Sequence, residues 1–330
     1  MSFFLRPILI TLLLLVSSFL SNTVNDAGVT ANPGCEQVNQ RSISLRVENK
    51  AGASVDSLRA EDVTLLEDKT SREVLRLENR TNESVAVAIL IDTSISQERL
   101  LPQIKLAAQY FVEEALQTNK DRAAVISFTG EAKVETNLTS NVADLRSAIS
   151  RVRFVPPPGY AGGGTVISGR VPVSSSPQVL AGTTAIWDAV WMTTDQILKA
   201  ATGSPRAIVL FTDGEDTSSR KNLSEAVEYA SRNDVEVFAI GIADKSFGGP
   251  DHNGLSKLTE ETGGRAFFPK KAAEQSEMLR QIVQELRSDY LLTYCASGAN
   301  MQRKPFKLKI QLTNSQSQES NKLFFRRYGF

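Results

Sequence analysis

The central part of the chain alternates between short apolar runs and amphipathic segments. Apolar runs such as "RAAVISF", "RAIVLFT" and "VEVFAIGI" have the length and composition of buried strands. Between them, apolar residues recur at helical spacing, as in "AIWDAVWMTTDQILKA" and "LSEAVEYASRN". Repeated alternation of this kind is typical of parallel strands joined by right-handed helical crossovers. We therefore expect an α/β fold with a doubly wound, mostly parallel sheet and helices on both faces.

Both flanks of this region have a different pattern. Residues 42–77 show short alternating runs broken by the turn sequences "NKAG" and "EDKT", and β character returns in "YLLTYCA", "FKLKIQL" and "KLFFRRYGF". We expect the two flanks to complete one another as a small β module. The predicted division is a β-rich N-terminal flank at 36–82, an α/β domain at 84–289 and a β-rich C-terminal flank at 290–330.

Within the α/β region, residues 153–183 are rich in proline, glycine and serine. Such composition is typical of a flexible surface insertion. Long loops inside compact domains are also often functional, so a binding loop is the alternative.

Residues 1–25 are expected to be a signal peptide, since Arg6 precedes the apolar run "PILITLLLLVSSFL". An uncleaved anchor is the alternative, but the run is shorter than the roughly 20 residues that a spanning helix needs. No later segment predicts a membrane span, which indicates a secreted or periplasmic protein. Export permits a disulfide between Cys35 and Cys295 if the two flanks pair.

Charge and composition exclude several classes of function. Lysine plus arginine and aspartate plus glutamate both number 37, so no net field would attract nucleic acid, and any partner must be recognised locally. One histidine and two cysteines are too few for a structural zinc site. The histidine, His252, lies in "GGPDHNG" and is expected to be a solvated loop residue.

The apolar run 85–91 ends abruptly in Asp92, followed by Ser94 and Ser96. Asp92 is then the first residue beyond a buried strand, at the carboxyl edge where open α/β sheets bind ligands. An extended loop would direct all three side chains to one side. Their hard oxygen atoms suit Mg²⁺ or Mn²⁺. Alternatively, Asp92 or Ser96 simply caps the following helix.

Two further segments converge on the same edge. The strand "RAIVLFT" ends in Asp213, and "AGTTAIWDAV" places Thr184 at the start of a helix. Taken together, Asp-x-Ser-x-Ser, a distant threonine and Thr-Asp-Gly resemble the von Willebrand factor type A domain with its metal-ion-dependent adhesion site. Asp188 matches an acidic helix position four residues after the threonine.

The resemblance covers about residues 84–289 and has two departures. Ile95 fills a position where glycine is frequent, and Thr165 in "GGGT" is a rival to Thr184. We prefer Thr184 because a helix start gives a ligand a fixed position. The flanking segments resemble a bacterial type A-related family described especially from acidobacteria, which has no assigned biochemical function.

The resemblance implies a cell-adhesion type of function, in which the cation completes its coordination with an Asp or Glu carboxylate of a protein ligand. The metal ligands would be Asp92, Ser94, Ser96, Thr184 and Asp213. A metal-free scaffold of the cell envelope and a Mg²⁺-dependent hydrolase are the alternatives. We expect no enzyme, because the chain lacks a nucleophile elbow and both common nucleotide-binding glycine motifs.

Overall fold

The computed structural model of the chain describes most residues beyond the N-terminal segment. The described residues are 35, 39–55, 57–157, 159–162, 165–166, 182–287, 290–296, 306–313, 321–325 and 328–329. The predicted signal peptide therefore lies outside the described residues.

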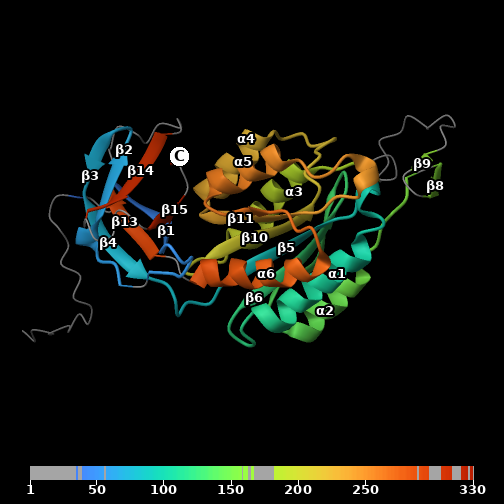
Figure 1. Ribbon diagram of the computed structural model, residues 1–330, viewed down its shortest axis with the longest axis horizontal. Coiled ribbons are helices and arrows are strands. Elements are labelled where there is room, and N and C mark those ends of the chain that lie inside the picture. The colour runs from blue at the N-terminus through green and yellow to red at the C-terminus, as the bar shows by residue number, and fades with distance from the viewer. Residues whose placement is uncertain are drawn as a thin grey trace, which may run out of the picture. The chain divides into compact units, whose positions relative to one another are not determined.

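A six-stranded sheet forms the centre of the α/β region (Figure 1), in the order β12-β11-β10-β5-β6-β7. Its strands are β5 (Ala86–Asp92), β6 (Arg122–Phe128), β7 (Ala132–Thr139), β10 (Arg206–Thr212), β11 (Val235–Gly241) and β12 (Ala266–Phe267). All neighbouring pairs are parallel except β6 and β7, which are antiparallel. The predicted fold class is confirmed, and the antiparallel edge strand follows from the short connection after Phe128.

Helices cover both faces of this sheet (Figure 1). One face carries α1 (Leu101–Tyr110), α2 (Val142–Arg151) and α6 (Ala272–Arg287). The other carries α3 (Ile186–Thr193), α4 (Leu223–Arg232) and α5 (His252–Thr262). Helices α1 and α3 each continue into a π-helical turn, at Phe111–Ala115 and Thr194–Leu198.

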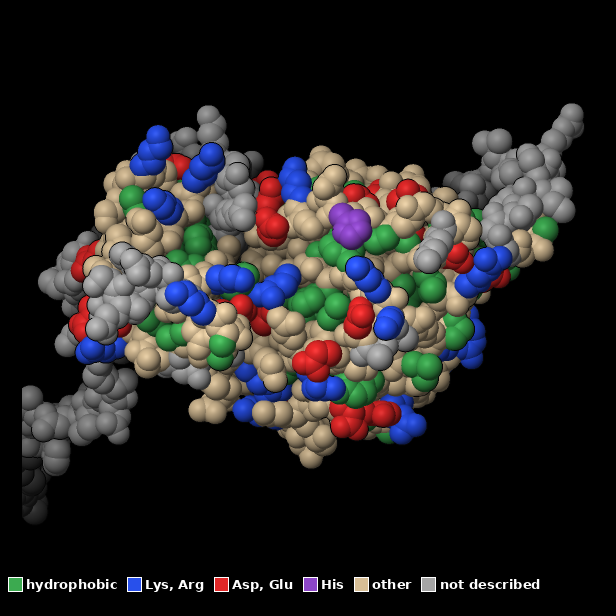
Figure 2. Space-filling model, in the orientation of Figure 1, with side chains coloured by type: hydrophobic (Ala, Val, Ile, Leu, Met, Phe, Trp, Pro, Cys, Tyr) green, Lys and Arg blue, Asp and Glu red, His purple; other side chains and the backbone are tan. Residues whose placement is uncertain are grey.

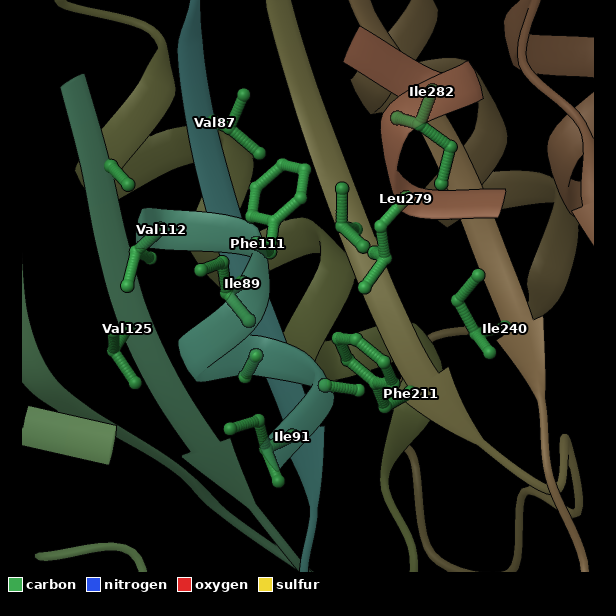
Figure 3. Close-up of a cluster of buried hydrophobic side chains, with 14 of the residues drawn as sticks. Val87, Ile89, Ile91, Phe111, Val112, Val125, Phe211, Ile240, Leu279 and Ile282 are labelled. Atoms are coloured by element: carbon green, nitrogen blue, oxygen red, sulfur yellow. The ribbon is translucent and has the colours of Figure 1, made fainter. Parts of the chain in front are cut away.

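Alternate residues of β5 serve the two cores. Val87, Ile89 and Ile91 pack under α1 and α6 (Figure 3), while Ala88 and Leu90 belong to the core on the opposite face. All these side chains are fully buried. Burial on both faces explains the uninterrupted apolar run. It also makes Asp92 the first polar side chain of the strand.

The two flanks of the chain build one β module, as predicted. One of its sheets has the order β15-β1-β13-β4 and the other β16-β14-β2-β3, so each combines strands from both flanks. The N-terminal strands are β1 (Gln40–Glu48), β2 (Val63–Glu67), β3 (Thr70–Arg72) and β4 (Val74–Asn79). The C-terminal strands are β13 (Tyr290–Cys295), β14 (Phe306–Leu312), β15 (Lys322–Phe324) and β16 (Tyr328–Gly329).

The β module has its own hydrophobic core, contributed by both flanks. Ile43 and Leu45 of β1 pack with Tyr290 and Leu292 of β13, and all four are almost completely buried. In β14, buried and exposed residues alternate strictly, which places Lys307 and Lys309 on the solvated face. A strand with one wet face accounts for these two lysines without nucleic acid.

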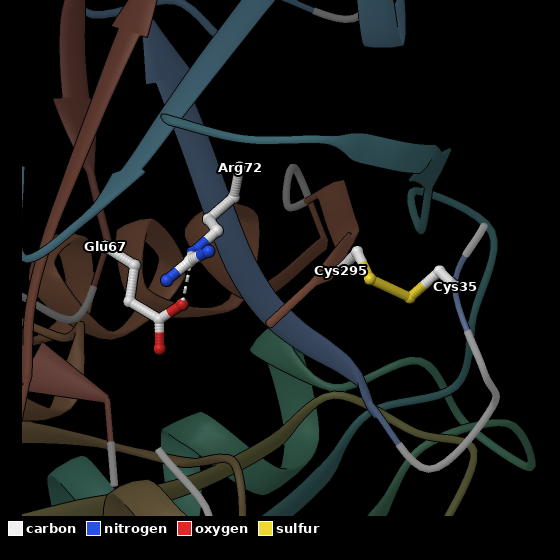
Figure 4. Close-up of a disulfide and its surroundings, with 4 residues drawn as sticks. All are labelled: Cys35, Glu67, Arg72 and Cys295. Carbon is white, nitrogen blue, oxygen red and sulfur yellow. Dashed lines mark hydrogen bonds and ion pairs between the residues drawn. A yellow bond between two sulfur atoms is a disulfide. The ribbon is translucent and has the colours of Figure 1, made fainter. Parts of the chain in front are cut away.

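A disulfide joins Cys35 to Cys295, as the pairing of the flanks predicted (Figure 4). The Cα atoms of the two cysteines lie 6.0 Å apart, within the usual range for such a bond. In the same β module, Nε of Arg72 donates to Oε2 of the buried Glu67 at 2.8 Å. In the described part of the chain, no helix combines the length and the apolar character needed to cross a bilayer.

Candidate functional site

The segment after β5 folds into a tight loop at the carboxyl edge of the sheet. The hydroxyl and the amide of Thr93 both donate to the carbonyl oxygen of Phe128, at 3.0 and 2.8 Å. The backbone N–H of Ser94 donates to Oδ1 of Asp92 at 2.9 Å, and the hydroxyl oxygens of Ser94 and Ser96 lie 3.1 Å apart. The structure thus gathers the three residues of the Asp-x-Ser-x-Ser motif in one place.

The end of β10 lies beside this loop because β10 is the parallel neighbour of β5. Phe211 is in register with Ile91, so the next residue, Thr212, is aligned with Asp92. The hydroxyl of Thr212 donates to Oδ2 of Asp92 at 2.6 Å, and Asp213 follows directly. Asp213 is 3% exposed and Asp92 is completely buried.

Both oxygens of the Asp213 carboxylate are held by hydrogen bonds. The backbone N–H of Glu215 donates to Oδ1 at 3.1 Å, and the side-chain amide of Gln97 donates to Oδ2 at 3.0 Å. Gln97 is completely buried and also donates to the carbonyl oxygen of Ile242. The turn after Asp213 requires a glycine, since Gly214 has φ of +90° and a Cβ there would lie 2.8 Å from Leu255.

Burial and like charge raise the pKa of Asp92 from 3.8 to about 7. Loss of hydration is the larger cause, and the nearby carboxylate of Asp213 is the second. Hydrogen bonds from Thr212 and Ser94 act in the opposite direction. The site therefore holds two close, buried carboxyl groups that resist being charged together.

Thr184 lies at the same edge, between the ends of β6 and β10. The next residue, Ala185, donates its N–H to the carbonyl oxygen of Thr129 at 2.7 Å, and the N–H of Thr217 donates to the carbonyl oxygen of Thr184 at 2.8 Å. Thr184 is 5% exposed, and within the described residues no hydrogen bond holds its hydroxyl. Its rival, Thr165, lies in the short strand β9 (Thr165–Val166).

Two described residues of the predicted insertion, Gly182 and Tyr160, approach the Asp-x-Ser-x-Ser loop and the turn that follows it. A Cβ at Gly182 would lie 2.8 Å from the side chain of Ile95 and 3.0 Å from that of Pro157. The hydroxyl of Tyr160, in β8 (Tyr160–Gly162), donates to Glu98. Ile95, the departure from the usual glycine, thus fills the space beside Gly182 and links the loop to the segment that leads to Thr184.

The capping alternative is wrong for Asp92 and Ser96. The N-cap residue of α1 is Leu100, and no side chain caps this helix. The cap of α3 comes instead from Asp216, whose Oδ2 accepts the N–H groups of Ile186 and Trp187 at 2.8 and 3.2 Å. Asp188 accepts backbone N–H groups of Arg220 and Lys221 and so secures the loop after β10.

Sequence reasoning missed three residues that organise this edge. Thr212 could have been found by aligning the last apolar residues of the two parallel strands, which puts it opposite Asp92. Gln97 gives no such signal, because a glutamine after a turn is ordinarily exposed. Asp216 lies in a polar stretch where any of several side chains could supply a cap.

The side chains at this edge fit a hard divalent cation. Two carboxylates and three hydroxyls offer oxygen atoms only, and oxygen is the ligand that Mg²⁺, Mn²⁺ and Ca²⁺ prefer. The mutual repulsion of Asp92 and Asp213 is the specific observation, because a cation between them would remove it. Among the described residues, no cluster of three or more His, Cys, Asp or Glu could hold a metal, so a cation at this edge would also need the hydroxyl groups.

His252 differs from its expected place in a solvated loop. It is exposed but is the first residue of α5, and its ring lies against that of Phe268, with centroids 3.9 Å apart. The cap of α5 explains the change, because Asp251 accepts the N–H groups of Asn253 and Gly254.

Comparison with solved structures finds chains with a partial likeness to this one. A von Willebrand factor type A protein from Catenulispora acidiphila is 12% identical, with 89% of this chain and 74% of that one covered and a TM-score of 0.48. An aerotolerance-related membrane protein from Bacteroides fragilis is 18% identical over 61% of this chain and 98% of that one, with a TM-score of 0.44. A comparison with curated proteins found no match.

A third solved structure is proximal thread matrix protein 1 from the mussel byssus, with a zinc-occupied adhesion-site motif. It is 16% identical over 65% of this chain, with a TM-score of 0.44, and this chain spans about half of its length. Likeness at these levels of identity concerns the fold alone.

Family models identify the domain itself. Two models described as von Willebrand factor type A domain match the chain, one over residues 87–215 and the other over residues 173–285. Together they extend from β5 to α6 and include the whole of the site. Domains of this kind are generally interaction modules rather than enzymes. The chain is therefore a von Willebrand factor type A domain protein.

Proposed function

We propose that this protein is an extracytoplasmic module that binds a protein partner through a divalent cation, Mg²⁺ or Mn²⁺. The observation that carries the proposal is the pair of buried carboxyl groups, Asp92 and Asp213, surrounded by hydroxyls. Without a cation, burying two close carboxylates is unfavourable. Such an arrangement is readily explained if a cation compensates them.

In this proposal the cation ligands are Asp92, Ser94, Ser96, Thr184 and Asp213. A bound cation would supply positive charge and an exchangeable position that attracts a carboxylate oxygen of an Asp or Glu of the partner. The surrounding residues keep the ligands in place. Thr212 and Gln97 orient the two carboxylates through hydrogen bonds of 2.6 and 3.0 Å.

The disulfide between Cys35 and Cys295 supports the proposed extracytoplasmic location. Disulfides persist in secreted and periplasmic proteins and are rare in the reducing cytosol. Residues 1–25, read as a signal peptide, support the same location.

The decisive test is calorimetric titration of the chain with Mg²⁺ and with Mn²⁺, followed by affinity capture of partners from envelope extract in Mg²⁺ or in EDTA. We expect cation binding and a partner that is lost in EDTA. Asp92→Ala should abolish both, while the matched control Asp144→Asn, an exposed acid on α2, should change neither.

Two outcomes would overturn the proposal. If neither cation binds, or if a captured partner is retained equally in EDTA, the metal-free scaffold replaces it. If the protein in Mg²⁺ turns over a panel of phosphoesters or peptides, and Asp92→Ala removes that activity, the hydrolase replaces it.

A further inference from the structure

A second pocket lies at the carboxyl edge of the sheet, beyond the end of β11. It has a volume of about 350 Å³. Its walls come from the turn and helix that follow the Asp-x-Ser-x-Ser loop, from residues 241–243 after β11, from the start of α5 and from residues 268–275. Figure 2 shows the single histidine of the chain on this face, with hydrophobic and basic side chains around it.

The polar side chains of this pocket are hydrogen-bond donors or amides, and none is acidic. Lys270, Lys271, His252, Gln103 and Gln275 line it. Neither lysine has an ion-pair partner within the described part of the chain. Glu274 is not part of the pocket wall, and its Oε2 accepts the backbone N–H groups of Lys270 and Lys271 at 2.7 and 3.4 Å. The pocket therefore favours a negatively charged group.

Gln275 is the strongest sign that the pocket is built for a ligand. Its side chain is only 2% exposed, yet no described residue makes a hydrogen bond with its amide. The amide atoms of Gln275 are not among the fully buried polar atoms that lack a partner, so they reach the space of the pocket. Because Gln275 lines the pocket and is otherwise enclosed, a molecule in the pocket is the partner that its amide can reach.

The rest of the wall is apolar and firmly positioned. The ring of Phe268 rests directly on the backbone of β11, since a Cβ at Gly241 would lie 2.5 Å from its Cδ1. The ring of His252 lies against the same ring, tilted by 36°, and Leu100 and Ile242 also line the pocket. A suitable ligand thus combines a negative group with an apolar body.

The pocket is coupled to the cation site by shared structure. Gln97 donates to Oδ2 of Asp213 and also to the carbonyl oxygen of Ile242, which lines the pocket. The N–H of Asp251, next to His252, donates to the carbonyl oxygen of Asp213 at 2.7 Å. One extended segment of a partner lying along this edge would meet both places.

We propose that this pocket binds an organic carboxylate with an apolar body, presented by the same partner whose acidic side chain coordinates the cation. The part of this proposal that names the partner as the carrier of the carboxylate rests on the proposed function. The pocket itself contains none of the cation ligands, so its binding chemistry can be tested without metal or partner.

The probe is 3-phenylpropanoate, titrated into the isotopically labelled full mature chain in EDTA and followed by amide chemical shifts. We expect saturable shifts centred on residues 241–243 and 268–275, and weaker binding of the neutral 3-phenylpropanamide. The double variant Lys270→Gln/Lys271→Gln should weaken 3-phenylpropanoate roughly tenfold, since a charge-assisted hydrogen bond is lost. Gln275→Leu should have a similar effect.

A matched double variant, Lys257→Gln/Lys309→Gln, removes the same charge from exposed positions outside the pocket and should leave probe binding unchanged. Both lysine pairs are solvent-exposed, so unfolding would not confuse the result. Equal binding of the carboxylate and the amide, or no localised shifts, would overturn the proposal. Tighter binding of phenyl phosphate than of 3-phenylpropanoate would also overturn the carboxylate assignment.

The link to the partner is tested separately. Lys270→Gln/Lys271→Gln should weaken partner capture in Mg²⁺ while leaving calorimetric cation binding unchanged. If the probe binds but cation binding is absent, the proposed function fails and the pocket stands alone. If cation and partner bind normally to the double variant, the shared-partner part of the proposal is wrong.

Discussion

Two groups of buried charged residues in this molecule differ in how their charges are compensated. One is the charged cluster of Arg46 and Glu48 on β1, Arg265 before β12 and Glu285 on α6. There, Nη2 of Arg46 lies 2.9 Å from Oε2 of Glu285, and Nη2 of Arg265 lies 3.0 Å from Oε1 of Glu48. The guanidinium groups of Arg46 and Arg265 also lie over the ring of Phe324.

The charged cluster contains two cations and two anions, so the chain itself supplies the neutralising charges. Burial and, to a smaller extent, the like charge of Glu48 raise the pKa of Glu285, but the two cations Arg46 and Arg265 both oppose this shift. At the cation site, by contrast, Asp213 adds to the effect of burial on Asp92. The difference is that the charged cluster contains its own neutralising charges, whereas Asp92 and Asp213 repel each other and the proposed cation would supply the compensating charge.

The largest predicted effect is the pH dependence of the cation site in EDTA. The pKa of Asp92 is raised in the folded state, so the neutral carboxyl group is favoured by folding. Its contribution to the free energy of unfolding is therefore complete below about pH 4 and is lost as the pH rises through about 7. A change from 3.8 to about 7 corresponds to about 4 kcal/mol of unfolding free energy. Denaturant unfolding of wild type and Asp92→Asn from pH 4 to pH 8 measures this effect as the difference between their free energies of unfolding. A difference that does not change with pH would contradict the prediction.

Breaking the charged cluster should cost slightly less. Arg46→Met leaves Glu285 buried with only one cation, which destabilises the fold by about 3 kcal/mol. This loss should be the same in Mg²⁺ and in EDTA, because no bound cation takes part. Denaturant midpoints measure it, with Arg59→Gln as the control, since the ion pair of Arg59 with Glu61 is exposed. If Mg²⁺ restored the stability lost in Arg46→Met, the charged cluster would not differ from the cation site in this respect.

At pH 8, adding Mg²⁺ should stabilise the proteins that keep Asp92 and should have almost no effect on Asp92→Asn. At a Mg²⁺ concentration one hundred times the dissociation constant, wild type should gain about 2.7 kcal/mol by mass action. Arg46→Met should gain the same amount, while Asp92→Asn should gain almost none. Thermal unfolding with and without Mg²⁺ measures these shifts, and an equal gain in Asp92→Asn would show that the cation binds elsewhere.

The smallest effect concerns the support of Asp213. Gln97→Leu removes the hydrogen bond to Oδ2 of Asp213 without changing any proposed cation ligand. Loss of such a supporting contact should weaken Mg²⁺ binding about tenfold. Calorimetry measures the affinity, and Gln109→Leu, on α1, is the control. Unchanged affinity would mean that Glu215 alone suffices to position Asp213.

Most of the architecture could be predicted because burial imposes simple patterns. The double-sided burial of β5 and β10 produces apolar runs that stop at Asp92 and Asp213, so the sheet edge is visible in the sequence. The β character of the two flanks predicts that they pair, and strands β1 and β13 confirm it. The five predicted cation ligands meet at one edge, although metal binding by them stays a prediction.

What could not be predicted depends on contacts between distant segments. The role of Gln97 arises because its buried amide reaches both Asp213 and the backbone after β11. The match of Ile95 to Gly182 is a matter of shape that no local pattern records. The charged cluster likewise needs β1 and α6 to approach, more than two hundred residues apart in the sequence. The predicted domain limits and the signal peptide stay predictions.

The shared β module has a consequence for the order in which the chain folds. Gln40 of β1 is in register with Cys295 of β13, so the first strand of the module has no such partner until more than two hundred further residues have been made. The type A domain, whose sheet pairs strands nearer in sequence, can form earlier during synthesis. Residues 39–79 would meanwhile remain a substrate for chaperones or proteases. Completion of the β module, closed by the disulfide, would then mark a chain in which both flanks of the type A domain have been made.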